Sequence, residues 1–166
     1  MPELPPLGSK ILDLETALGR FGRPRDHRLV FTNGCFDLLH PGHVAYLDEA
    51  RRLGDALIVG VNTDASVRRQ GKGEDRPLVA QEARLAVLAG LASVDALVLF
   101  DTDTPIDLIT ALRPDVLVKG GDYTIDRIVG APEVQQDGGE VRVIPFLPGY
   151  STTALLDRIR SANTAE

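Results

Sequence analysis

The sequence predicts a single α/β domain built on a Rossmann-like, doubly wound, five-stranded parallel sheet. Three observations support this fold class. Short apolar runs with little alternation recur along the chain, as is typical of parallel strands buried on both faces. Amphipathic helical patterns fill most intervals between these runs. The chain has 166 residues and 43% hydrophobic content, which is the size of one domain rather than two.

The elements alternate along the chain. Strands are expected over residues 29–32, 57–61, 96–100, 116–118 and 141–146. Helices are expected over residues 11–21, 44–53, 81–91, 105–112 and 153–159. Gly54 is expected to end the second helix, and Thr104 to cap the fourth. We expect residues 1–27 to form an N-terminal helix and lead-in, residues 28–161 the main domain, and residues 162–166 a frayed tail.

Composition disfavours several classes of function. The formal net charge of −6 disfavours binding to nucleic acid or anionic membranes, because both reward clustered Lys and Arg. Cys35 is the only cysteine, so no intrachain disulfide can form. The start of the chain does not read as a signal peptide, and no apolar run is long enough to span a bilayer. We therefore expect a cytoplasmic protein, in which an anionic substrate would need a local positive pocket.

The segment 32–43, which follows the first strand, carries the strongest functional signal. Parallel sheets bind ligands beyond the carboxyl ends of their strands, where the strand order reverses. Gly34 and Gly42 permit close backbone approach, and the start of the next helix offers unpaired N–H groups to a phosphate. His40 and His43 can both face one anion and donate hydrogen bonds to its oxygens. The pattern favours a phosphate-binding loop.

Two other interpretations of this loop are weaker. A lone histidine is usually a surface or packing residue, but two of the three histidines in the chain fall in this one window. A metal site would need further ligands, and the only candidate nearby is Asp37.

The strand, the Gly-Cys-Phe-Asp turn and the His-Pro-Gly-His loop resemble the cytidylyltransferase-like branch of the nucleotidyltransferase superfamily. With the blocks 61–67, 118–123 and 150–153, residues 32–160 are similar more narrowly to the adenylyltransferases that make ADP-heptose from D-glycero-β-D-manno-heptose 1-phosphate. The resemblance implies transfer of AMP from ATP to this sugar 1-phosphate, with Mg²⁺ as cofactor, in a homodimer. Because a sugar-kinase domain is often fused to this activity and 166 residues leave no room for one, we expect the stand-alone form.

The residues and the resemblance together predict three groups of site residues. The catalytic group is His40, His43 and Lys72. The nucleotide-binding group is Asn33, Gly34, Cys35, Phe36, His40, His43, Lys119, Gly121, Asp122, Tyr150, Ser151, Thr152 and Thr153. The group that binds the acceptor or phosphate is Asp37, Asn62, Asp64 and Arg76. Mg²⁺ is expected to bind through the ATP phosphates, with Asp37 as the candidate protein ligand.

Ordinary structural roles are alternatives for several of these residues. Lys72 and Arg76 fit an exposed basic loop, and Asp122 fits an ordinary turn. Lys119 ends a strand before Gly120 and Gly121, where a nucleobase could lie on bare backbone. In the segment 151–153, one hydroxyl is expected to cap the last helix, which leaves the others for triphosphate oxygens.

The expected reaction needs no general base, because the attacking phosphate oxygen is already anionic near neutral pH. The site must align in-line attack on the α-phosphorus and stabilise developing negative charge. Three other functions stay open: a glycerol-3-phosphate-type cytidylyltransferase, which shares the His-x-Gly-His loop, a nucleotide-binding module without turnover, and a flavodoxin-like binding domain with another ligand.

Overall fold

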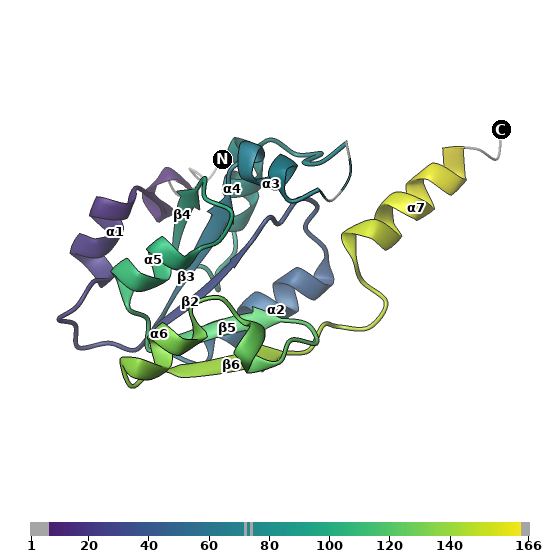
Figure 1. The fold of residues 1–166 in the computed structure, drawn as a ribbon. Coiled ribbons are helices and arrows are strands. Elements are labelled where there is room, and N and C mark those ends of the chain that lie inside the picture. The colour runs from purple at the N-terminus through teal and green to yellow at the C-terminus, as the bar shows by residue number, and fades with distance from the viewer. Residues whose placement is uncertain (1–6, 72, 74, 164–166) are drawn as a thin grey trace.

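A computed structural model describes residues 7–71, 73 and 75–163, and these form a parallel six-stranded sheet between two layers of helices (Figure 1). The strand order is β1-β4-β3-β2-β5-β6. The strands are β1 (Ile11–Leu12), β2 (Leu29–Gly34), β3 (Ala56–Asn62), β4 (Ala96–Phe100), β5 (Val116–Gly120) and β6 (Glu140–Ile144). The helices are α1 (Leu14–Phe21), α2 (Pro41–Arg51), α3 (Asp64–Arg69), α4 (Gln81–Ala89), α5 (Ile106–Leu112), α6 (Ala131–Gln136) and α7 (Thr152–Asn163), with the 3₁₀ helices η1 (Leu7–Lys10) and η2 (Ile125–Arg127).

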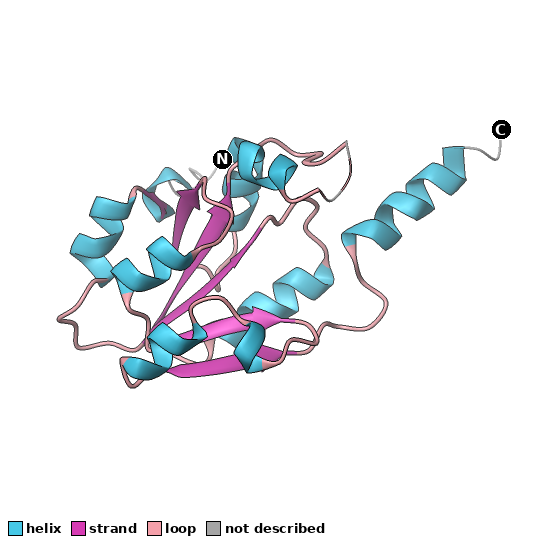
Figure 2. Ribbon diagram, viewed as in Figure 1, coloured by secondary structure: helices cyan, strands magenta, loops and turns pink. Residues whose placement is uncertain are grey.

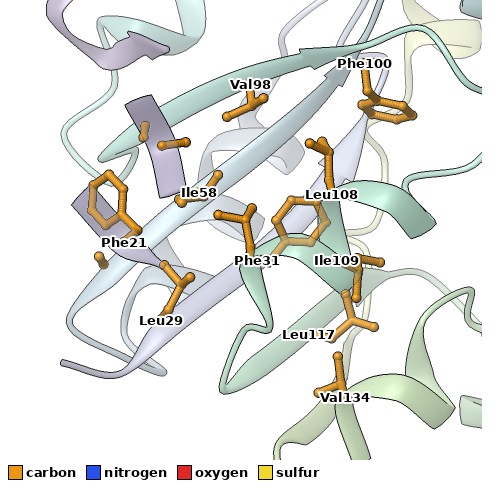
Figure 3. Close-up of a cluster of buried hydrophobic side chains, with 14 of the residues drawn as sticks. Phe21, Leu29, Phe31, Ile58, Val98, Phe100, Leu108, Ile109, Leu117 and Val134 are labelled. Carbon is orange, nitrogen blue, oxygen red and sulfur yellow. The ribbon is translucent and has the colours of Figure 1, made fainter. Parts of the chain in front are cut away.

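Both faces of the sheet are buried, which explains why the strands show little alternation. Phe31 of β2 and Ile58 of β3 belong to a cluster that α1, α5 and α6 cover (Figure 3). Their neighbours Val30 and Val59 belong to a second cluster on the opposite face, under α2 and α4. The α/β, doubly wound fold class is therefore confirmed.

The sheet has one strand more than the sequence predicts. Residues 11–21 were expected to form one helix, but β1 occupies the first two positions and pairs with β4 at the sheet edge. Helix α1 begins only after Asp13, whose carboxylate accepts a hydrogen bond from the Thr16 amide. A two-residue strand is too short to show a period, so periodicity could not separate it from the helix.

Other boundaries also differ from the prediction, and three of them concern an expected cap or strand end. Helix α5 has Pro105 at its N-cap and no side-chain cap, so Thr104 does not cap it. Helix α2 ends at Arg51 with Arg52 as its C-cap, so Gly54 lies beyond the helix end. Strand β6 ends before Pro145, which lacks an N–H group for the ladder, and Phe146 therefore lies outside the sheet.

The path of the chain creates one reversal of strand order. It runs from β2 through β3 to β4 on one side, then crosses to β5 and β6 on the other side of β2. Helix α7 extends away from the layered body (Figure 2). Within the described ranges, none of the helices combines the length and apolar character that crossing a membrane requires.

Candidate active site

A cleft of about 440 Å³ lies where the strand order reverses, at the carboxyl ends of β2 and β5. Of the residues expected at the site, the cleft is lined by Asn33, Gly34, Cys35, Phe36, Asp37, His40, His43, Arg76, Lys119, Tyr150, Ser151, Thr152 and Thr153. Those not among its lining residues are Asn62, Asp64, Gly121 and Asp122. Lys72 lies outside the described residues. Lining residues that the sequence did not single out are Tyr46, Val67, Tyr123 and Phe146.

His40 and His43 stack at the start of α2. Their ring centroids are 3.8 Å apart and their planes differ by 23°. His40 is the N-cap residue of α2, Pro41 follows at the start of the helix, and no side chain caps this end. Gly42 makes room for the pair, because a Cβ atom there would lie 3.0 Å from the His40 ring. The helix N-terminus and two imidazoles thus converge where a phosphate would bind.

Both histidines are neutral near pH 7. Burial lowers the pKa of His40 below its ordinary value. Burial, together with the neighbouring His40, lowers the pKa of His43 to about 4, although a backbone hydrogen bond at Leu38 opposes this shift. A neutral imidazole still carries one N–H group. Neutral His40 can therefore donate one hydrogen bond to an anion, whereas the single N–H of neutral His43 meets the Leu38 backbone, so His43 donates to an anion when that contact breaks or when the ring takes up a proton.

Lys119, near the end of β5, supplies a cation to the cleft. Its Nζ lies 3.5 Å from Oδ1 of Asn33 on β2 and 5.7 Å from the ring centroid of Tyr123. Tyr46 links α2 to β5 and β2 beside this point, since its hydroxyl donates to the Val118 carbonyl at 3.3 Å and forms a hydrogen bond with the Thr32 hydroxyl. Burial raises the pKa of Tyr46, so this phenol stays protonated.

Asp37 holds the segment before α4 against the loop after β2. Its carboxylate accepts from Arg76 Nη1 at 2.7 Å and from the Leu78 and Val79 amides at 2.9 Å each. Burial acts to raise the pKa of Asp37, but these three donors outweigh it and lower the pKa. The side chains of Asp37 and Arg76 are 4% and 15% exposed. This arrangement favours a structural role for both residues.

The described residues do not build a cage for a metal ion. Over residues 7–71, 73 and 75–163, no three His, Cys, Asp or Glu side chains are grouped closely enough to hold one. Both oxygens of Asp37 already accept hydrogen bonds from protein donors. A Mg²⁺ ion would therefore depend on oxygens that the nucleotide brings with it, which is how Mg²⁺ is usually bound beside triphosphates.

Arg84 of α4 ties together three segments behind the cleft, and the sequence pattern did not single it out. Its buried guanidinium donates to the carbonyl groups of Cys35, Asn62 and Val79 and to the carboxylate of Asp64. A charged residue at a core position of an amphipathic helix is the sequence signal that could have found it. It fixes the backbone of the loop that carries the histidines.

Asn62 and Asp64, the site residues expected at the end of β3, form contacts inside the protein. Asn62 is buried and its Nδ2 donates to the Ser66 hydroxyl at 2.9 Å, and Asp64 Oδ1 lies 2.7 Å from Arg84. Cys35 Sγ lies 3.4 Å from Oε1 of Gln70. These contacts order the cleft floor rather than present Asn62 and Asp64 to the cleft.

The segment before α7 forms the remaining wall. Ser151 caps the helix, since its Oγ accepts from the Ala154 amide at 3.0 Å. Thr152 lies against the loop after β2, with its hydroxyl 3.4 Å from the Leu38 carbonyl. One hydroxyl thus serves as a cap, as expected from the sequence, and Thr153 lines the cleft beside it.

Comparison with known proteins identifies relatives of the chain. A family model described as cytidylyltransferase-like matches residues 31–158. The bifunctional protein HldE of Acidiphilium cryptum is 60% identical over 139 residues, which are 84% of this chain and 28% of that protein. HldE of Geotalea uraniireducens is 52% identical over 157 residues, or 95% of this chain and 32% of that protein. The chain thus spans less than a third of the length of these relatives.

Solved structures agree on the fold. The lipopolysaccharide core biosynthesis protein from Thermoplasma volcanium is 29% identical, with a TM-score of 0.59 over 73% of this chain and 97% of that one. The pantoate-β-alanine ligase of Francisella tularensis has the same TM-score of 0.59 over 94% of this chain and 79% of that one. It is only 14% identical, so that likeness concerns the fold alone.

Proposed function

Because the chain belongs to the cytidylyltransferase-like family, we propose that it transfers AMP from ATP to D-glycero-β-D-manno-heptose 1-phosphate, giving ADP-heptose and pyrophosphate. The blocks 61–67, 118–123 and 150–153, which resemble the heptose 1-phosphate adenylyltransferases, support this choice of substrates. The similarity to a lipopolysaccharide core biosynthesis protein and to two HldE proteins points the same way.

The stacked pair of His40 and His43 at the start of α2 carries the proposal. An oxygen of the sugar phosphate attacks the α-phosphorus of ATP in line. The bond from the α-phosphorus to the oxygen that bridges it to the β-phosphorus breaks, and pyrophosphate leaves with that oxygen and the electron pair. The two imidazoles and the helix N-terminus donate hydrogen bonds to the oxygens on which negative charge develops.

Cations and hydroxyls complete the proposed site. Lys119 stabilises negative charge on the phosphates, and Thr152 and Thr153 offer hydroxyl groups to the triphosphate. Lys72 is proposed as a further phosphate contact on the resemblance alone. Lys72→Ala is then expected to impair nucleotide binding and turnover while leaving the melting temperature nearly unchanged. An unaltered rate at saturating ATP would show that Lys72 is merely solvated.

Mg²⁺ is proposed as part of the Mg-ATP substrate. It would neutralise charge on the triphosphate. The protein contributes the donors of α2 and Lys119 around that complex, in keeping with the missing ligand cluster among the described residues. The homodimer implied by the resemblance and the cytoplasmic location expected from the composition are proposals as well, and light scattering of the purified chain tests the first.

Pyrophosphate release over a panel of substrates tests the function. Each of ATP and CTP is combined with heptose 1-phosphate, unphosphorylated heptose or glycerol 3-phosphate, in the presence of Mg²⁺. We expect ATP with heptose 1-phosphate to be far better than every other pair. Faster reaction of CTP with glycerol 3-phosphate would replace the assignment with the cytidylyltransferase, and binding of nucleotide without any turnover would indicate a non-catalytic module.

A further inference from the structure

An aromatic ring lies on bare backbone at the end of β5. Phe146 follows the proline that ends β6, and its ring packs against Gly120 and Gly121. A Cβ atom on either glycine would lie 2.8 Å from this ring, so the contact depends on both glycines. Gly121 has a φ of +110°, a conformation that other residues rarely adopt. The backbone is thus shaped to receive the ring.

The outer part of the Phe146 ring stays open to the cleft. Phe146 is 62% exposed, Tyr123 48% and Tyr150 45%. Among the residues that the structure describes, these three are the exposed aromatic side chains, and all three line this cleft. Apolar rings gathered at one cleft and left open to water are typical of a surface that a ligand covers.

The same cleft contains donors suited to phosphate. The stacked histidines, the start of α2 and Lys119 lie in it together with the three rings. A ligand that carries both a phosphate chain and a flat ring matches this combination. Aromatic side chains bind nucleobases by stacking, because every base presents a π face.

We propose that the base of the nucleotide stacks on the exposed face of Phe146, and that this contact favours purine over pyrimidine nucleotides. The inference rests on the proposed function and names the residue that meets the base. A purine has two fused rings and covers more of the phenyl ring than a pyrimidine does, so it gains more from stacking. The base then contacts Phe146 rather than the backbone of Gly120 and Gly121, where the sequence suggested that it would lie.

Fluorescence tests the contact directly, because the chain contains no tryptophan. Phe146→Trp places the sole indole at the proposed platform, and Leu147→Trp places one at the adjacent exposed residue, which does not line the cleft. We expect ATP to quench the emission of the first variant and not the second, whereas inorganic tripolyphosphate quenches neither. Absence of quenching in Phe146→Trp at ATP concentrations that saturate its turnover would overturn the proposal.

Steady-state kinetics distinguish a Phe146 ring that stacks on the base from a ring that blocks the base. Phe146→Ala is expected to raise KM for ATP about tenfold, as loss of one stacking contact does, with little change in KM for the sugar phosphate. The preference of Phe146→Ala for ATP over CTP should be smaller than that of the wild type. Phe146→Tyr should restore the wild-type KM for ATP and the wild-type preference for ATP, and Leu147→Ala should have the wild-type values of both. A lower KM for ATP in Phe146→Ala would mean that the ring blocks the base, which overturns the proposal. ATP binding by the tryptophan variant needs no acceptor, so failure of heptose 1-phosphate to react would count against the proposed function alone.

Discussion

Replacing Asp37 tests whether its carboxylate holds a loop or ligates Mg²⁺. Asp37→Ala removes the acceptor of Arg76 and of the Leu78 and Val79 amides, in a region where the Arg76 side chain is only 15% exposed. Leaving a buried donor unpaired costs about 1–3 kcal/mol, and breaking a buried ion pair about 3–5 kcal/mol. Because these terms overlap, we expect a total loss of about 3–5 kcal/mol for Asp37→Ala.

Asp37→Asn separates the charge from the hydrogen bonds to the amides. The Asn oxygen can still accept from Leu78 and Val79, so the variant loses mainly the charge-assisted contact with Arg76. We expect it to cost about 1.5–3 kcal/mol. Asp75→Asn is the control, because Asp75 lies on the same segment with a side chain 67% exposed, and little change is expected there. Urea unfolding at pH 7 measures all three variants, and a wild-type midpoint in Asp37→Ala would refute the structural role.

Acid unfolding gives a second readout of the same contact. The Arg76 and amide donors lower the pKa of folded Asp37 in spite of its burial. A carboxyl whose pKa is lower in the folded state stabilises the protein above its unfolded pKa, near 4, and this contribution is lost as the pH falls through the folded pKa. Wild-type stability should therefore fall more steeply than that of Asp37→Asn below about pH 4.

The Mg²⁺ requirement distinguishes the two roles of Asp37. If the carboxylate only holds the loop, Asp37→Asn leaves the Mg²⁺ concentration for half-maximal turnover unchanged while the protein becomes less stable. If it ligates the ion, that concentration rises in the variant. Unchanged stability with a raised Mg²⁺ requirement would contradict the reasoning from the structure.

Three further predictions concern the histidine pair. His40→Ala and His43→Ala should each stay folded and lose about 10²-fold or more in turnover, and near-wild-type pyrophosphate release in both would exclude the mechanism. The pKa of His43 is about 4, and the negative charge of a nearby triphosphate should raise this pKa, so ATP binding at pH 5 should be accompanied by proton uptake. Calorimetry in buffers of different ionisation enthalpy measures that uptake. A binding enthalpy that does not depend on the buffer would exclude proton uptake by His43. Gly42→Ala should lower turnover by displacing the His40 ring, whereas Gly19→Ala, whose Cβ meets nothing within 4 Å, should not.

The fold class and the position of the cleft could be predicted from the sequence because both follow from local patterns. In the run 29–32 the first three residues are apolar without alternation, since Val30 and Phe31 pack on opposite faces of one sheet. A parallel sheet with helices on both faces binds ligands at the carboxyl ends of its strands. The loop with His40 and His43 follows the first expected strand, so its place at the cleft needed no knowledge of distant contacts.

The tertiary structure alone decided which residues support the cleft and which line it. Asp37 was expected at a ligand, and in the structure it lines the cleft and also pairs with Arg76, 39 residues away, while Arg84 reaches the Cys35 carbonyl across 49 residues. Phe146 was expected in a strand and lies in the cleft beside two glycines. The position of each side chain depends on packing between segments remote in the sequence, and a local pattern of residue types carries no information about that pairing.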